Sequence, residues 1–395
     1  MGHPRISAVL LALAIALAPG ASAVQLEFNA FGDFTAGENF GGPADDSQGD
    51  SFRTFGATEL PYNLNDGFGI VGTDFVVTAH LTDDLTYQGE INFQVDRGSR
   101  NEIEIDPERF YLDYAVSDAL NFQAGLYFTP IGYHNRFLYS RAWLLYSIQI
   151  PDLFEEELNL MPTHTVGINV HGTLEPFGQT FRYILGVGNA RGDTPDETIY
   201  ARQPFDDGVE VTALLEWQAP IEDTLIVGLS AWTSRIETSL VPSGVGSSVD
   251  PDTAPTVRMQ EVGFIPYVTY YGRHFNMLLE GFYAELHDDG NDLPKDQFSI
   301  GGLTAEVSLN FLRNTLHPYV RYDFTRLPSP GDDPYYSLRD GGGTIDRVFL
   351  SEMSAFIFGA AYDLNAHARL KTEAIYNFHG ARDRWGLQAQ IAFGF

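Results

Sequence analysis

The chain has 395 residues, of which 53 are acidic and 23 basic, so that its formal net charge is −30, and it contains no cysteine. The lack of cysteine excludes disulfides and cysteine-based metal sites. The acidic balance argues against nucleic acid as a partner, because phosphates are bound by positive charge. Aromatic residues make up 13% of the chain. A polar average with many aromatics is typical of a membrane β-barrel, in which only alternate residues meet lipid.

Residues 1–23 have the features of a secretory signal peptide. His3 and Arg5 precede an apolar run over 6–17, and Ala21-Ser22-Ala23 supplies the small residues that a signal peptidase accepts. The run is shorter than the roughly 18 apolar residues that a spanning helix needs. We therefore predict cleavage before Val24 and a single barrel over residues 24–395.

Apolar and polar residues alternate in segment after segment of residues 24–395, and this period of two indicates half-buried strands. From Leu85 to Asp96, for example, apolar positions face one way and polar positions the other. The predicted strands cover 24–34, 70–81, 85–96, 108–117, 120–128, 164–174, 180–190, 208–218, 224–235, 260–271, 274–286, 300–312, 316–326, 354–363, 367–378 and 385–395. Most are close to the 9–11 residues that a tilted strand needs to cross a bilayer. Sixteen strands are predicted, and fourteen or eighteen are the alternatives.

Short connections that carry turn residues, such as 82–84 and 221–223, alternate with long stretches rich in Gly, Pro and Asp. The long stretches are 35–69, 129–163, 191–207, 236–259, 287–299 and 327–353. This pattern predicts an all-β fold, a transmembrane antiparallel β-barrel with short periplasmic turns and long extracellular loops. The sheet must close, because every backbone polar group at membrane depth needs a partner. A soluble β-sandwich or propeller is the alternative architecture.

The alternation also assigns side chains to the inner face of the barrel, where acids outnumber bases. The acids are Glu27, Asp33, Asp74, Glu90, Asp96, Asp113, Glu210, Glu216, Glu261, Glu280, Glu306, Asp323, Asp363 and Glu373. The bases are Arg109, Arg182, Arg321, Arg369 and Lys371. A narrow passage focuses such a field, so the acid excess favours cations. Salt screens charges over about 8–10 Å, so the preference is expected to be moderate.

The loop over 129–163 is too apolar to extend into solvent. We predict that it folds into the barrel and carries Asp152, Glu155, Glu156 and Glu157 towards Arg321, Arg369 and Lys371 on the opposite wall. With Arg109 and Arg182, these residues would form a constriction that is crossed by a transverse field. The alternative is a loop that packs over the mouth or against a neighbouring subunit.

Three features resemble known families. The last strand, with Phe393 and Phe395 in alternation, looks like the assembly signal of Gram-negative barrel proteins. Sixteen strands with a long loop after the fifth resemble general porins. The stretches 125–132 (GLYFTPIG) and 162–167 (PTHTVG) are similar to the phosphate-selective porin-like group.

These resemblances imply a passive diffusion channel for small hydrophilic solutes in the cell outer membrane. The implied partners are outer-membrane lipid and lipopolysaccharide and the barrel-assembly machinery, and a homotrimer is left open. Phosphate selectivity would imply a ladder of Arg and Lys in the lumen, which the chain lacks. The fold and the diffusion role are therefore carried over, but the substrate is not.

Two other classes of function are the alternatives. A hydrolase is not expected, because the chain has neither a Gly-x-Ser-x-Gly elbow nor a His-Glu-x-x-His helix. A triad assembled across strands would be recognised only by its geometry. A substrate-specific channel, for example for oligosaccharides, would need a track of aromatic residues, for which Tyr111, Tyr127, Trp232, Tyr267 and Tyr319 are candidates. No cofactor and no metal site are expected.

Overall fold

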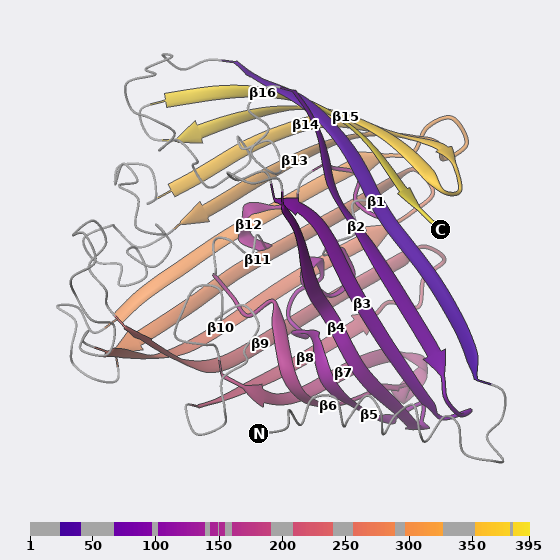
Figure 1. Cartoon of the computed structure of the whole chain (residues 1–395), viewed down its shortest axis with the longest axis vertical. Helices are drawn as coiled ribbons and strands as arrows, with labels where there is room; N and C mark the ends of the chain where they lie inside the picture. Colours follow the sequence, from indigo (N-terminus) through magenta and orange to yellow (C-terminus); the bar gives the residue numbers. More distant parts are fainter. Residues whose placement is uncertain are drawn as a thin grey trace.

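The computed structural model describes residues 24–40, 67–96, 102–138, 143–148, 150–154, 160–190, 208–239, 256–288, 297–326, 352–379 and 382–395. The predicted signal peptide lies outside these residues. The strands are β1 Gln25–Phe40, β2 Gly67–His80, β3 Leu85–Asp96, β4 Glu102–Ser117, β5 Leu120–Phe128, β6 His164–Leu174, β7 Thr180–Asn189, β8 Val209–Gln218, β9 Thr224–Ser239, β10 Thr256–Tyr271, β11 Phe275–Asp288, β12 Gln297–Leu309, β13 Leu316–Arg326, β14 Glu352–Asn365, β15 Ala368–His379 and β16 Arg382–Gly394. They form one closed antiparallel barrel, in which each strand pairs with its sequence neighbours and β1 pairs with β16 (Figure 1).

The prediction of sixteen strands in a transmembrane-type barrel is confirmed, and the differences lie at strand ends. β1, β9 and β10 extend several residues beyond the predicted limits, because pairing continues past the stretch needed to cross a bilayer. β4 begins at Glu102 rather than at residue 108. Pro107 interrupts the alternation there, but it sits at a β-bulge, where the register shifts between Glu90 and Ile91 of β3. A bulge accommodates both the missing N–H and the extra residue.

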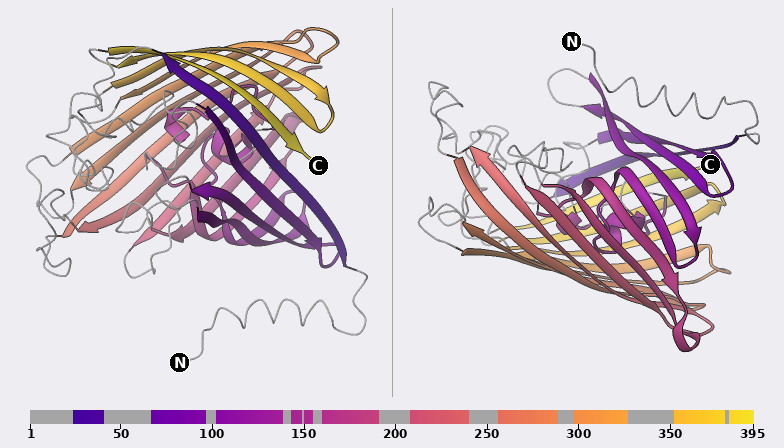
Figure 2. Two further views of the ribbon diagram at one scale, coloured as in Figure 1. Left: turned by 45° about the horizontal axis from the view of Figure 1, so that its top comes forward. Right: turned by 90° about the horizontal axis from the view of Figure 1, so that it is seen from below.

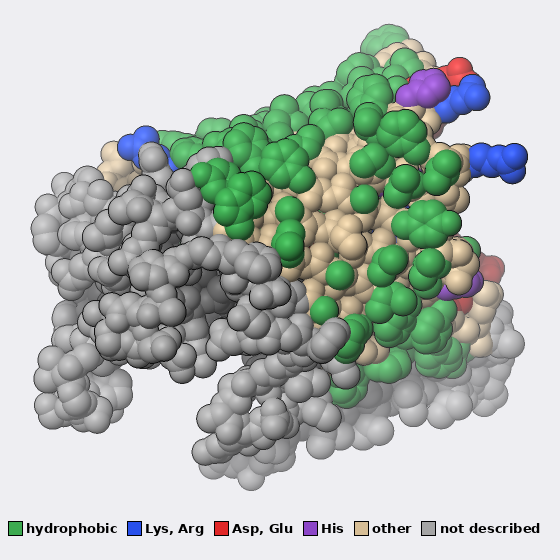
Figure 3. Space-filling model, turned by 90° about the horizontal axis from the view of Figure 1, so that it is seen from above, with side chains coloured by type: hydrophobic (Ala, Val, Ile, Leu, Met, Phe, Trp, Pro, Cys, Tyr) green, Lys and Arg blue, Asp and Glu red, His purple; other side chains and the backbone are tan. Residues whose placement is uncertain are grey.

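The outer face of the barrel is apolar. In β10 the exposed side chains include Val262 and Phe264, while their neighbours Glu261 and Gly263 are buried. The last strand behaves in the same way, with Leu387 exposed and Gln388 buried. Figure 3 shows hydrophobic side chains spread over the side of the barrel, with charged side chains and histidines gathered at its rim. Among the described residues, no helix is long and apolar enough to cross a membrane.

One end of the barrel carries the short connections, and we call it the short-turn end. These connections are 81–84, 118–119, 175–179, 219–223, 272–274, 310–315 and 366–367. β5 ends at the opposite end of the barrel, and the described residues of its connection to β6 lie within the ring of strands (Figure 2). It contains a short π-helix, η1 (His134–Leu138), and a 3-10 turn, η2 (Asp152–Phe154).

The inner face is not polar throughout, which corrects the expectation of polar inner faces on every strand. β9 to β12 carry inward apolar side chains that form a buried cluster: Trp232, Ile236, Met259, Ile265, Phe282, Ala284, Leu286, Phe298 and Ile300. The physical reason is that residues from the β5–β6 connection pack onto this patch, so its apolar surface is removed from water inside the lumen.

Candidate functional site

The chain leaves the barrel wall at the end of β5. β5 has 9 residues and pairs with β4 only as far as Phe110 and Leu126. The two ends of the connection are held together, because Thr129 N donates to Thr163 O at 2.9 Å. Asn135 Nδ2 donates to both of their carbonyls, at 2.9 and 3.0 Å. We call the described residues between 129 and 163 the inner segment.

A first anchor joins the start of the inner segment to β9 and β11. Gly132 N donates to Ser230 Oγ at 2.8 Å. Glu280, which is 0% exposed, accepts from Tyr133 N at 2.6 Å and from His134 N at 3.2 Å, and it lies 2.7 Å from His134 Nδ1. Gly132 has φ +64°, and a Cβ there would lie 2.2 Å from Glu280 Oε1. Glycine is therefore required for the chain to approach this carboxylate so closely.

A second polar contact, through Glu216, joins the inner segment to β8 and β10. Arg136 Nη1 donates to Glu216 Oε1 at 2.9 Å, and Tyr267 Oη donates to the same oxygen at 2.6 Å. Arg136 also lies 4.6 Å from the centroid of the Phe137 ring. A buried carboxylate needs such partners, since an uncompensated charge in the interior is costly.

A second anchor is apolar. Ile131, Leu153, Phe154, Leu160 and Met161 are all buried in the cluster on β9 to β12. Phe154 stacks on His134 of the first anchor with ring centroids 4.8 Å apart. These residues are part of the apolar surface that the sequence indicated must be buried.

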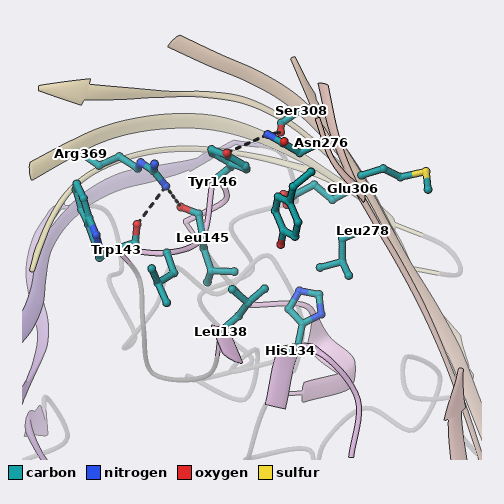
Figure 4. A pocket seen from close by; sticks show the side chains of 13 residues that line it. His134, Leu138, Trp143, Leu145, Tyr146, Asn276, Leu278, Glu306, Ser308 and Arg369 are labelled. Atoms are coloured by element: carbon teal, nitrogen blue, oxygen red, sulfur yellow. Dashed lines mark hydrogen bonds between the residues drawn. The ribbon is translucent and has the colours of Figure 1, made fainter. Parts of the chain in front are cut away.

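A third anchor fastens residues 143–148 to β13 and β15. Arg369 Nη1 donates to Trp143 O at 3.1 Å and to Leu145 O at 3.2 Å (Figure 4). Lys371 Nζ donates to Ser147 O at 2.8 Å. Arg321 Nη1 donates to the Ser147 hydroxyl at 2.7 Å.

The same anchor includes an acid that accepts from the inner segment. Glu373 accepts from Ile148 N at 2.9 Å and from Tyr319 Oη at 2.6 Å. The inner segment therefore contacts side chains of β8 to β13 and of β15, and it crosses the lumen from β5 to the far wall.

The predicted constriction residues fall into four groups. Arg321, Arg369 and Lys371 come together beneath residues 143–148. Arg109 lies elsewhere, in an ion pair with Glu90 and 4.8 Å from the centroid of the Phe128 ring.

Arg182 stands opposite Glu216 in the register of β7 and β8, but its side chain is exposed. Glu155, Glu156, Glu157 and the side chain of Asp152 lie outside the described residues, so the field between loop acids and wall bases stays a prediction. Phe393 and Phe395 stack with centroids 6.4 Å apart, and Phe395 N donates to Ala30 O of β1 at 3.0 Å.

Sequence reasoning missed the wall acids that hold the inner segment, Glu216, Glu280 and Glu373. Alternation placed them correctly on the inner face, but it gave no sign of what they contact. The aromatic track also looks different in the structure. Tyr127, Trp232 and Tyr267 are each 2% exposed, which leaves little ring surface facing an open passage. Among the described residues, no three His, Asp or Glu side chains are placed to hold a metal ion.

A cavity of about 120 Å³ lies between the inner segment and β10 to β12. Its lining from the inner segment includes His134, Leu138, Trp143, Leu145 and Tyr146, and its lining from the wall includes Tyr271, Asn276, Leu278, Glu306, Ser308 and Arg369 (Figure 4). Asn276 Nδ2 donates to Tyr146 Oη at 3.0 Å and joins the two sides.

No family model and no curated protein matches the sequence. Solved outer-membrane proteins share the fold. OmpT of Vibrio cholerae, described as an outer membrane protein in trimer form, is 14% identical with a TM-score of 0.59, and the match covers 95% of this chain and 100% of that chain. An anion-selective porin from Comamonas acidovorans is 9% identical with a TM-score of 0.58 over 94% and 100% of the two chains. The outer membrane channel DcaP of Acinetobacter baumannii is 11% identical with a TM-score of 0.56 over 96% and 100%. At these identities the likeness establishes the fold, which is that of outer-membrane porin barrels.

Proposed function

We propose that the protein is an outer-membrane porin, a passive diffusion channel for small hydrophilic solutes that prefers cations. The observation that carries the preference is the charge of the inner face. Among the described residues, the buried acids of the strands are Asp33, Asp74, Glu90, Glu108, Glu210, Glu216, Glu261, Glu280, Asp323 and Glu373, and the buried bases are Arg109, Arg321, Arg369 and Lys371.

Several of the bases are already compensated, so they add little positive potential to a passage. Arg321 Nε lies 2.9 Å from Asp323 Oδ2, and Arg369 Nε lies 2.6 Å from Asp363 Oδ1. The remaining acids make the net field of the inner face negative, and low-dielectric walls focus such a field on the passage. The channel would therefore raise the local concentration of cations and lower that of anions.

The inner segment would set the width of the passage in this proposal. Its three anchors draw it across the lumen, and its acidic stretch at Glu155, Glu156 and Glu157 would add to the negative field. The local likeness to the phosphate-selective porin-like group is not extended to function, because an acidic lumen disfavours phosphate. No catalytic activity is proposed.

The apolar outer face supports contact with outer-membrane lipid, and the fold supports a place in the outer membrane. Lipopolysaccharide and the barrel-assembly machinery would be partners there, and cleavage after residue 23 would accompany export. A homotrimer is also proposed, because a protein with the same fold is described in trimer form.

Swelling of liposomes that contain the purified protein tests the diffusion role. Neutral sugars of increasing size should enter at rates that fall steadily with solute size and rise linearly with concentration. A rate that saturates at low concentration for one sugar would favour a substrate-specific channel. The absence of swelling with every sugar would contradict the proposed function.

A further inference from the structure

The cavity beside the inner segment is a partly open space between that segment and the wall. It lies near the short-turn end of the wall, because Tyr271 is the last residue of β10 and Asn276 the second residue of β11, on either side of the 272–274 turn. Its volume of about 120 Å³ is somewhat smaller than an engineered cavity of about 150 Å³ that binds benzene. The occupant that fits is a compact molecule of roughly five or six non-hydrogen atoms.

Glu306 brings to this cavity a carboxylate that accepts no hydrogen bond from a described side chain. Within the described part of the chain, no hydrogen bond or ion pair joins its carboxylate to another side chain. The arginines nearby are bound elsewhere. Its cross-strand neighbour Arg321 contacts Asp323 and Ser147, and Arg369 contacts Asp363 and the backbone of the inner segment. Arg321 and His134 attract Glu306 electrostatically but do not donate a hydrogen bond to it, so its carboxylate still lacks a donor.

The other polar groups of the lining largely satisfy one another. Asn276 Nδ2 donates to Tyr146 Oη at 3.0 Å and to Ser308 Oγ at 3.3 Å. Burial raises the pKa of the Tyr146 hydroxyl above its ordinary value, so this group stays neutral. The apolar part of the lining is formed by Leu138 and Leu145 of the inner segment and by Leu278 of β11, the cross-strand neighbour of Glu306 (Figure 4).

We infer that this cavity binds a small alkylammonium ion, with its ammonium group on Glu306 and its alkyl chain among Leu138, Leu145 and Leu278. An ammonium group supplies both the positive charge and the N–H donors that a desolvated carboxylate requires. A metal cation would leave the apolar wall without a contact, an alcohol would leave the charge without a partner, and an anion would be repelled. The inference goes beyond passive diffusion, because it assigns a binding site inside the lumen.

Binding is measured on the purified full-length protein in deuterated detergent, by ligand-observed proton NMR with n-butylammonium and with n-butanol as the neutral isostere. Wild-type protein should bind n-butylammonium saturably and more tightly than n-butanol. Glu306→Gln keeps the shape of the side chain and should weaken n-butylammonium binding by roughly 10- to 100-fold, the range for a hydrogen bond to a charged group. Leu278→Trp fills the cavity and should abolish binding while Glu306 remains.

Asp113→Asn is the matched control. Asp113 of β4 is also an inner-facing acid towards the short-turn end, but it lies across the barrel from the cavity. Its Oδ2 atom is 2.8 Å from Nε2 of His171. This variant should bind n-butylammonium as wild type does. Migration on gels before and after boiling confirms that each variant is a folded barrel. Absence of saturable wild-type binding, equal affinity for n-butanol, or equal weakening by Glu306→Gln and Asp113→Asn would overturn the inference.

The readout does not depend on transport. A protein that conducts ions but does not bind n-butylammonium would overturn this inference alone. A protein that binds it through Glu306 but forms no channel would overturn the proposed function alone.

Discussion

Replacing Glu280 with Ala should release the start of the inner segment from the wall. The carboxylate is fully buried and contacts Tyr133 N, His134 N and His134 Nδ1. A hydrogen bond to a charged group contributes about 1.5–3 kcal/mol. The three contacts share one residue and are not additive, so the expected loss is at the upper end for one such bond, about 3 kcal/mol.

A loss of that size changes the balance between the docked and the released arrangement by roughly two orders of magnitude, since about 1.4 kcal/mol is a factor of ten. The apolar anchor around Leu153 and Phe154 remains, so the segment should fluctuate rather than leave the lumen. Single-channel recordings in planar bilayers should then show frequent transitions between conductance levels, and a mean conductance above that of wild type.

Two further variants make the result specific. Glu280→Gln retains one carbonyl oxygen for Tyr133 N or His134 N, so its recordings should be intermediate. Asp113→Asn removes an inner acid that contacts His171 rather than the inner segment, and its recordings should remain as quiet as those of wild type. If Glu280→Ala folds into a heat-modifiable barrel and its recordings cannot be distinguished from wild type, this carboxylate does not hold the segment.

Three other predictions concern the inner segment. Gly132→Ala places a Cβ against Glu280 at φ +64°, and a strain of about 1–3 kcal/mol should lower the unfolding temperature and increase current noise; an unchanged melting curve would contradict it. Leu153→Ala opens a hole in the apolar cluster and should destabilise the barrel by about 2–5 kcal/mol in denaturant titrations, and a loss below about 1 kcal/mol would show that the cluster is loosely packed. Joint replacement of Glu155, Glu156 and Glu157 by Gln keeps side-chain size and should weaken the preference for K⁺; unchanged selectivity would place these residues outside the passage.

The strand pattern was predictable because a barrel wall separates lipid from water, so that apolar and polar residues alternate along each strand. Where both faces of a strand are apolar, this alternation disappears. Ile265 and Phe282 face the lumen, yet they look the same in sequence as residues that face lipid. Pro107 shows a different limit. The bulge beside it breaks the strict alternation, so residues 102–107 of β4 were not predicted as strand.

The candidate site was predictable only in part. Arg321, Arg369 and Lys371 could be placed on one wall from alternation, and the apolar content of the loop indicated burial. The partners of these bases could not be foreseen, because two arginines and a lysine bind backbone carbonyls and a hydroxyl of the inner segment as well as acids. Such contacts depend on the path of an irregular segment, and an irregular segment has no repeating pattern of apolar and polar residues from which its path could be predicted.

The zero-current potential of the purified protein in a planar bilayer under a KCl gradient measures whether the protein is a cation-preferring channel. We expect ohmic current steps and a potential whose sign shows that K⁺ passes more readily than Cl⁻, with a preference that weakens as salt is raised because screening shortens the reach of the inner acids. Current steps with a potential that favours Cl⁻ at low salt would contradict the cation preference, and a bilayer that shows no steps at all would contradict the channel.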